Sequence, residues 1–167
     1  STDITLRNMA VEVGRIKRMV DSLTGVQMGT WKPGLIDSTD NEPTGMVYQA
    51  QEGHYTRIGN LIVAYFYIKL SNRGTGNGAM RIYSLPAPVG QYYSSFPVSI
   101  FTNMASMNNL CVTLSKGDWC GLLRGVNDSM EQTNLQHANL TDTTELTGTI
   151  VYSVDPRFEG FNDLRGY

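Results

Sequence analysis

Paired carboxylates are the groups in this sequence whose spacing comes closest to catalytic chemistry. Two acids held a few ångströms apart across a glycosidic bond can cleave it. The candidates are Asp37 with Asp40 and Glu42, Asp118, Asp128 with Glu131, and Asp142 with Glu145. Spacing alone does not distinguish these groups from solvated loops, and the sequence lacks the long repeat of the parallel β-helix that usually holds such acids. We therefore expect the protein not to be an enzyme.

Other reactive side chains are few. His54 and His137 are the only histidines, and each is more typical of a surface or turn residue than of a general base. Cys111 and Cys120 have no neighbouring metal ligands, so we interpret both as packing residues, with a disulfide between them as the alternative. The glycines of 74–78 lack the spacing of a dinucleotide loop and indicate a hairpin turn. The sequence predicts no metal site and no cofactor.

Aromatic residues offer a second kind of chemistry, because rings stack on the CH faces of sugars while Asp, Asn and Arg pair with sugar hydroxyls. Tyr92, Tyr93 and Phe96 lie in a turn-rich stretch. For Tyr92 and Tyr93, the sequence does not distinguish between rings exposed to a ligand and rings packed in the core. Trp119 lies in a strand-like run with Cys120, and we expect it to be buried.

The composition excludes two classes of partner. There are 13 Lys and Arg against 15 Asp and Glu, with no basic block, so a nucleic acid is not expected. No apolar stretch reaches the roughly 20 residues that span a membrane, so insertion is not expected either. The 17 glycines and 9 tyrosines, with only 17% charged residues, are typical of an all-β domain with many turns.

The first 28 residues predict a coiled-coil helix that joins several copies of the chain, followed by a linker. Apolar residues recur with alternating steps of three and four: Leu6, Met9, Val13, Ile16, Val20 and Leu23. These are the a and d positions of three heptads, which places Glu12 at g and Lys17 at the following e, where they can pair between helices. Three heptads are marginally stable alone, so the next domain must help to hold the oligomer. The alternative is one amphipathic helix docked on its own domain.

Residues 29–167 predict a single antiparallel β-sandwich or jelly roll. The run 61–68 is apolar on both alternating faces, which suggests a sandwich interior on one side and a subunit interface on the other. Either Tyr65 and Tyr67 or their neighbours Phe66 and Ile68 would line that interface. Further strands are expected at 46–51, 79–85, 98–102, 110–114, 119–123 and 146–154. All prolines are expected between these runs or at their ends.

Several blocks resemble the ends of bacteriophage tail fibres and tailspikes. They are Gly-Thr-Trp-x-Pro at 29–33, Tyr-x-x-Gln-x-Gly-x-Tyr-Thr-Arg-Ile-Gly-Asn at 48–60, Ser-x-x-Gly-Thr-Gly at 71–76, Ile-x-x-Leu-Pro at 82–86 and Leu-x-Gly-Thr-Ile-x-Tyr at 146–152. The resemblance implies a homotrimeric fibre tip on the virion, assembled in the host cytoplasm. It also implies an upstream tail or baseplate protein, and a bacterial cell-surface glycan or protein as receptor.

For such a fibre tip we expect the receptor site on loops far from the helix, within 91–95 and 127–137. The rings would come from Tyr92 and Tyr93, and the hydrogen-bonding groups from Asn127, Asp128, Gln132 and Asn134. Two alternatives remain from other classes. One is a small tail-associated enzyme that degrades polysaccharide or acts as an esterase, and the other is a purely structural trimerisation domain.

Overall fold

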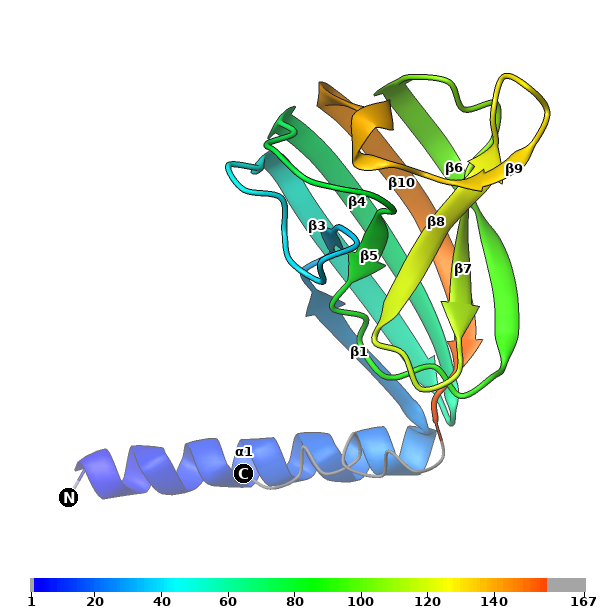
Figure 1. Ribbon diagram of the computed structural model, residues 1–167. Coiled ribbons are helices and arrows are strands. Elements are labelled where there is room, and N and C mark those ends of the chain that lie inside the picture. The colour runs from blue at the N-terminus through cyan, green and yellow to red at the C-terminus, as the bar shows by residue number, and fades with distance from the viewer. Residues whose placement is uncertain (1, 156–167) are drawn as a thin grey trace.

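The computed structural model describes residues 2–155, without the side chains of residue 2 and residues 21–24. A helix, α1 (Thr2–Thr24), precedes a β domain (Figure 1). The strands are β1 (Val26–Trp31), β2 (Gly34–Ile36), β3 (Val47–Ile58), β4 (Leu61–Asn72), β5 (Arg81–Tyr83), β6 (Tyr93–Met104), β7 (Cys111–Ser115), β8 (Cys120–Val126), β9 (Gln132–Asn134) and β10 (Leu140–Ser153). A 3-10 turn (His137–Asn139) leads into β10. The predicted tail 158–167 lies outside the described residues.

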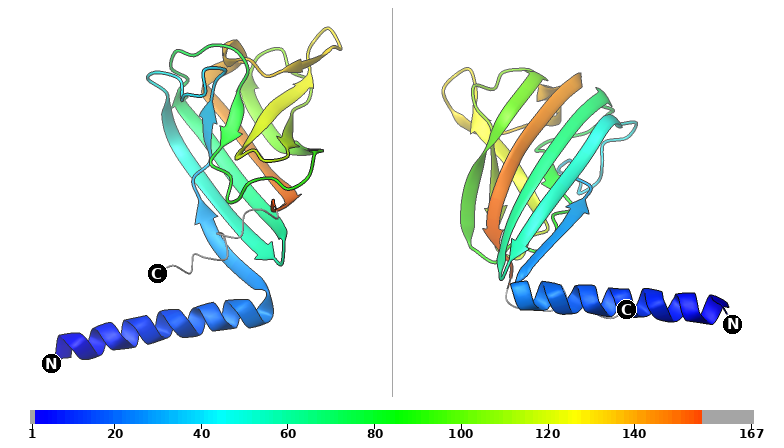
Figure 2. Two further views of the ribbon diagram at one scale, coloured as in Figure 1. Left: turned by 60° about the horizontal axis from the view of Figure 1, so that its bottom comes forward. Right: turned by 180° about the vertical axis from the view of Figure 1, so that it is seen from behind.

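The strands form one antiparallel sheet that curls on itself (Figures 1 and 2). Its order is β1-β3-β4-β10-β6-β7-β8-β5-β2, with β9 beside β8. The first part of β6 pairs with β7 and its second part with β10, so β6 joins the two layers. The mainly antiparallel class and the N-terminal helix are thereby confirmed. A separate sandwich or a jelly roll stays a prediction, because the two layers share β6.

One proline departs from the expected pattern. Pro97 lies within β6, paired with Cys111, and not at the end of a strand. The next residue, Val98, pairs with Gly148 of β10, so the proline stands where β6 changes partner. A missing amide donor is tolerated there because the hydrogen-bond ladder is already interrupted.

The core fills the space inside the curl. In β4, Ile62, Ala64, Phe66 and Ile68 are fully buried and point inward. They pack with apolar side chains from the facing layer, among them Leu35, Ile82, Val112, Leu114 and Leu123. Tyr65 and Tyr67 therefore lie on the outer face of the sheet. Of the two predicted interface sets, the structure leaves only the tyrosines available to a partner.

In the sequence blocks 29–33 and 48–60, Gly29 and Gly53 each lie opposite an aromatic residue of the other block. In the β1–β3 register, Gly29 lies opposite Tyr55, and Trp31 lies opposite Gly53. A Cβ on Gly29 would lie 2.6 Å from the Tyr55 ring, and one on Gly53 would lie 2.6 Å from the Trp31 indole. Each ring thus occupies the space above a glycine, which only a residue without a side chain can provide.

Helix α1 stands apart from the β domain, and its main contact with it is where it leads into β1 (Figures 1 and 2). Gly25, with a φ of 63°, ends the helix, and its carbonyl oxygen accepts a 2.9 Å hydrogen bond from Gly59 N. The predicted seam faces solvent: Leu6, Met9, Val13, Ile16 and Val20 are each at least half exposed. The side chain of Leu23 lies outside the described residues. The helix does not dock on its own domain, which was the alternative.

No helix in the described part of the chain combines the length and the apolar character needed to cross a membrane.

Candidate functional site

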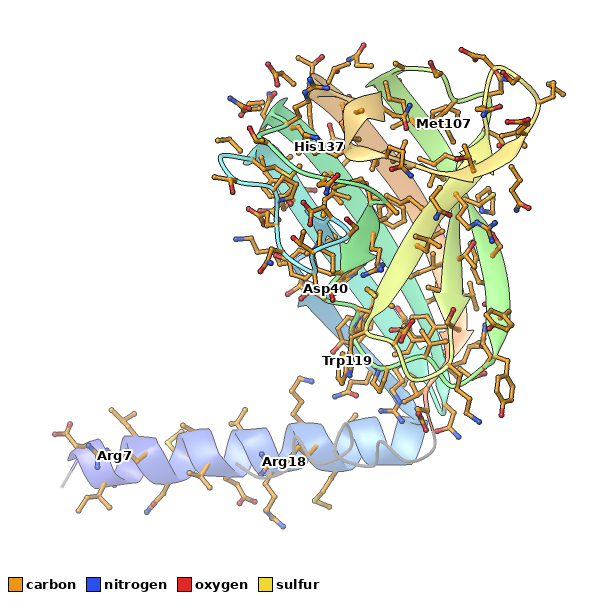
Figure 3. All side chains as sticks on the ribbon, viewed as in Figure 1. Arg7, Arg18, Asp40, Met107, Trp119 and His137 are labelled. Atoms are coloured by element: carbon orange, nitrogen blue, oxygen red, sulfur yellow. The ribbon has the colours of Figure 1, made fainter. Side chains whose placement is uncertain are left out.

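The β domain has two ends, which we name by their distance from the helix. The proximal end holds the β3–β4 turn at Gly59, the start of β6 and the β7–β8 turn with Trp119. The distal end holds the β8–β9 turn, the end of β6 and His137. Figure 3 shows this separation, with Trp119 near α1 and both Met107 and His137 far from it.

The structure does not bring the predicted receptor residues together. Tyr92 and Tyr93 lie at the proximal end, where Gly90 N donates a 2.6 Å hydrogen bond to the Ser153 carbonyl oxygen at the end of β10. Asn127 and the residues that follow it lie at the distal end. Both β6 and β8 run from the proximal to the distal end, so a segment before β6 and a segment after β8 are far apart. The prediction that 91–95 lies far from the helix is wrong.

At the proximal end, two exposed rings border a shallow hollow of about 520 Å³. Tyr92 and Tyr93 are 72% and 80% exposed, which decides between the two readings left open by the sequence. Lys116 Nζ lies 4.6 Å from the centre of the Tyr92 ring, a cation–π contact. Ser115, the cross-strand partner of Tyr93, completes the lining. Rings, a hydroxyl and an ammonium group together suit a hydroxyl-rich or acidic ligand.

Trp119 corrects another expectation. It was expected to be buried within a strand, but β8 begins at Cys120 and Trp119 is 46% exposed. Gly117, with a φ of 88°, extends the turn between β7 and β8, so Trp119 falls in that turn. The Trp119 carbonyl oxygen accepts a 3.0 Å hydrogen bond from Leu85 N. The proximal end therefore presents a third exposed aromatic residue.

At the distal end, the predicted hydrogen-bonding residues differ in exposure and in the hydrogen bonds that they form within the chain. The side-chain oxygen of Asn127 accepts hydrogen bonds of 3.0 Å from Ser129 N and Glu131 N, so it holds the β8–β9 turn. Asp128 and Gln132 are exposed, whereas Asn134 is half-buried in β9. Only Asp128 and Gln132 offer their whole side chains to a ligand.

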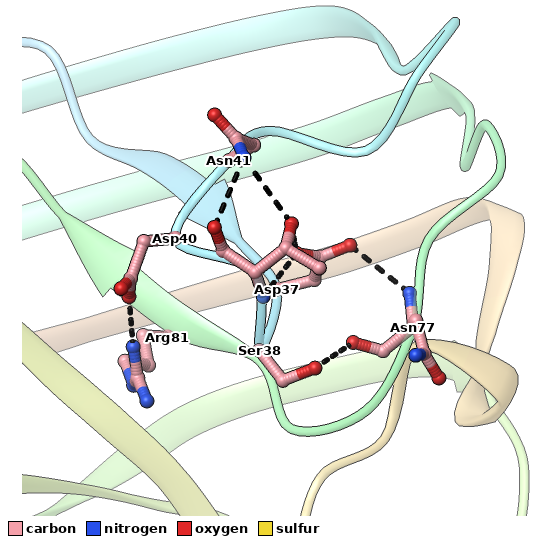
Figure 4. Close-up of polar contacts among 7 residues, drawn as sticks. Asp37, Ser38, Asp40, Asn41, Asn77 and Arg81 are labelled. Carbon is pink, nitrogen blue, oxygen red and sulfur yellow. Dashed lines mark hydrogen bonds and ion pairs between the residues drawn. The ribbon is translucent and has the colours of Figure 1, made fainter.

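The carboxylates around residue 37 fix loops to one another (Figure 4). The buried side chain of Asp37 accepts hydrogen bonds from Thr39 Oγ1, Thr39 N and Asn77 N, at 2.5, 2.8 and 3.0 Å. These bonds, above all that from the Thr39 hydroxyl, hold the pKa of Asp37 below its usual value. Asp40 forms a salt bridge with Arg81. Both acids are thus engaged by partners of their own.

Three further candidate acids accept hydrogen bonds from neighbouring residues. Glu42 accepts hydrogen bonds from the hydroxyls of Tyr48 and Tyr83, at 3.5 and 3.4 Å. Burial is the main cause that raises the pKa of both tyrosines, and the Glu42 charge adds to it. Asp142 accepts from Arg73 N, and Glu145 from the Tyr67 hydroxyl.

Both histidines contact residues that are close to them in the fold. His137 is buried, with Nε2 2.9 Å from the Arg73 carbonyl oxygen. His54 stacks on Tyr65, its cross-strand partner, with ring centres 6.1 Å apart. Cys111 and Cys120 are free thiols, so the disulfide alternative is wrong. Within residues 2–155, no three potential metal ligands of the His, Cys, Asp and Glu types cluster together.

Comparison with known proteins gives a match among solved structures. No family model matches the chain. No curated protein matches it either. Among solved structures, the Dettilon tailspike protein shares the fold, with a TM-score of 0.60 and 12% sequence identity over 77% of this chain. The match covers 24% of the tailspike chain, so this protein corresponds to about a quarter of it. At this identity the similarity establishes a shared fold.

Proposed function

We propose that this chain is the host-attachment part of a phage tail fibre or tailspike. The observation that supports this most is the fold shared with part of a tailspike protein. The sequence blocks at 29–33 and 48–60 point to the same class of protein and correspond to the paired strands β1 and β3. In this arrangement α1 leads towards the virion, where an upstream tail or baseplate protein would hold the fibre.

The proposed assembly is a homotrimer joined through α1. The seam of Leu6, Met9, Val13, Ile16 and Val20 leaves a row of apolar side chains in water unless other helices cover it. Within one chain Glu12 binds Arg15, and in a parallel bundle its g position also faces Lys17 of a neighbouring helix. Valine at a with isoleucine or leucine at d does not choose between two and three helices. The number three follows from the resemblance to tail fibres.

The proposed receptor is a bacterial surface glycan, bound without cleavage. Tyr92 and Tyr93 present stacking faces, and Lys116 adds a positive charge beside them. Because these residues lie at the proximal end, a long glycan would reach them along the flank of the fibre. Asp128 and Gln132 are the predicted residues that remain at the tip. Three copies around one axis raise avidity by about 10² or more where the receptor spacing allows it.

The test is attachment of the full-length chain, carrying a fluorescent label, to a panel of bacterial strains. We expect stable labelling of some strains, and loss of labelling when purified envelope polysaccharide of a labelled strain is added in excess. The same polysaccharide, incubated with the protein, should release no new reducing ends and no acetate. Labelling of no strain contradicts attachment, and release of either product contradicts binding without cleavage.

A further inference from the structure

The outer face of the sheet is apolar at its proximal end. Two adjacent cross-strand rows run over β1, β3, β4 and β10. The first row is Val26, Ile58, Leu61 and Ser153, and the second is Met28, Thr56, Val63 and Val151. We call these eight residues, six of them apolar, the proximal patch. None of them is charged, and Val26, Met28, Ile58 and Leu61 are exposed.

The same face becomes polar towards the distal end. The third row contains Thr30, His54, Tyr65 and Thr149, and the rows beyond it include Glu52, Lys69 and Glu145. A free, solvated sheet face would carry polar side chains throughout. The apolar part is thus confined to the strand ends nearest to α1.

Nothing within the described residues of one chain covers this patch. Helix α1 contacts the β domain mainly at β1, and the view from behind shows the outer face of β1, β3, β4 and β10 uncovered (Figure 2). A contiguous exposed apolar area of this kind is typical of an interaction surface.

The position of the patch indicates what covers it. Gly59 N is bonded to Gly25 O, so the β3–β4 turn is fixed to the end of the helix. Helices packed side by side lie about 8–10 Å apart, so a parallel bundle of α1 brings the β3–β4 turns of all copies around one axis. Ile58 and Leu61 flank that turn directly, and Val26 is paired with Ile58. The apolar side chains therefore stand where neighbouring copies are forced to meet.

Charge supports a second copy as the occupant. Glu12 and Lys17 occupy g and e positions, which pair only between parallel helices in the same register. Such a bundle places equivalent parts of each β domain at the same height along the axis. The proximal patch has no charged residue, so it can pack against a neighbouring copy without burying a charge of its own.

We propose that the proximal patch packs against a second copy of this chain, so that the oligomer is held by the β domains as well as by α1. The inference rests on the trimer within the proposed function and is independent of the receptor. It explains how three heptads, which are marginal alone, can hold a stable assembly.

Its test compares two double variants of the full chain that introduce the same charges. The patch variant is Met28→Glu with Ile58→Glu. The control is Met130→Glu with Val47→Glu, at the distal end. Met28 and Met130 are 74% and 78% exposed, and Ile58 and Val47 are 52% and 50% exposed, at opposite ends of β3. The pairs match in exposure and side-chain type and differ in position relative to the helix.

The measurement is molar mass by light scattering and sedimentation over a range of protein concentrations, with circular dichroism as the check of folding. We expect the parent and the control to keep the trimer mass, and the patch variant to dissociate at a concentration at least about tenfold higher. If the patch variant unfolds, the same masses are measured for Met28→Ser with Ile58→Thr. These substitutions remove apolar surface without adding charge, and we expect this variant too to dissociate at higher concentration than the parent. A patch variant that associates as the control does, or a parent that is monomeric, would overturn the inference. Cell attachment is not a readout, so failure of the receptor proposal would be recognised separately.

Discussion

The indole of Trp31 lies over Gly53, its cross-strand partner, and its Nε1 donates a 3.0 Å hydrogen bond to the Tyr65 carbonyl oxygen. One side chain on the edge strand β1 thus reaches across β3 to β4. This contact needs position 53 to have no side chain.

We therefore expect Gly53→Ala to destabilise the β domain. The added Cβ would lie 2.5 Å from the Trp31 carbonyl oxygen and 2.6 Å from its indole, and relief of such overpacking costs about 1–3 kcal/mol. Denaturant unfolding of the full chain measures the loss. Gly14→Ala is the control, since Gly14 is helical and a Cβ there meets only Arg18 Nη1 at 3.7 Å. It should raise helix stability by about 0.5–1 kcal/mol. Equal effects of the two variants would contradict the proposed contact.

A second prediction concerns the seam of α1. Val13→Asp places a charge at an a position, whereas Val11→Asp places the same charge at an f position, outside the seam. The two valines are 65% and 68% exposed in the single chain, so a lone helix would tolerate both changes alike. We expect Val13→Asp to raise the concentration of half-dissociation at least about tenfold and Val11→Asp to leave it nearly unchanged, as measured by sedimentation. Identical sedimentation of the two variants would argue against the seam.

A third prediction separates the two ends of the predicted receptor site. Tyr92→Ala with Tyr93→Ala should reduce labelling of cells, with the trimer mass and melting temperature unchanged, because both rings are exposed. Asp128→Ala with Gln132→Ala removes the free hydrogen-bonding groups at the distal end and should have the smaller effect. Flow cytometry of labelled cells gives both values. Undiminished labelling by the tyrosine variant would move the site away from the proximal hollow.

A fourth prediction concerns pH. Asp37 is buried and its pKa is lowered, so its carboxylate stabilises the fold above the ordinary aspartate pKa of about 3.9, and this contribution is lost as pH falls through the depressed value. Asp37→Asn should cost about 1–3 kcal/mol at pH 7, and the difference from the parent should shrink towards pH 3 and below. Unfolding at both pH values measures it, with the exposed Asp128→Asn as a neutral control. A difference of equal size at both pH values would speak against a charge effect.

The sequence predicted those features that depend on local periodicity. The alternation in 61–68 identified both faces of β4, and the inward set, from Ile62 to Ile68, is fully buried. The heptads identified α1. The strands β1, β2 and β9 were missed, and for β2 and β9 the reason is that three residues give too little periodicity to recognise.

The receptor site was predicted less well because it depends on strand direction. Whether Tyr92 lies near Asn127 is decided by the order of β6, β7 and β8 in the sheet, which is set by long-range pairing and not by nearby residues. The exposure of Trp119 was not predicted because it follows from one turn residue. Gly117 has a positive φ and extends the turn, so β8 begins only at Cys120. The Lys-Gly-Asp sequence at 116–118 was the available signal for that turn.

The place of β10 in the sheet has a consequence for biosynthesis. β10 lies between β4 and β6, yet within residues 2–155 it follows every other strand along the chain. Hairpins such as β3–β4 and β7–β8 can form while the polypeptide is still emerging from the ribosome, but the two halves of the sheet are joined only by this last strand. Until then β4 and β6 each present an unpaired edge, which is prone to aggregation. A ribosome that stalls before Leu140 would therefore release a chain that cannot close its core, and such a product is expected to be lost to proteolysis before it can enter a fibre.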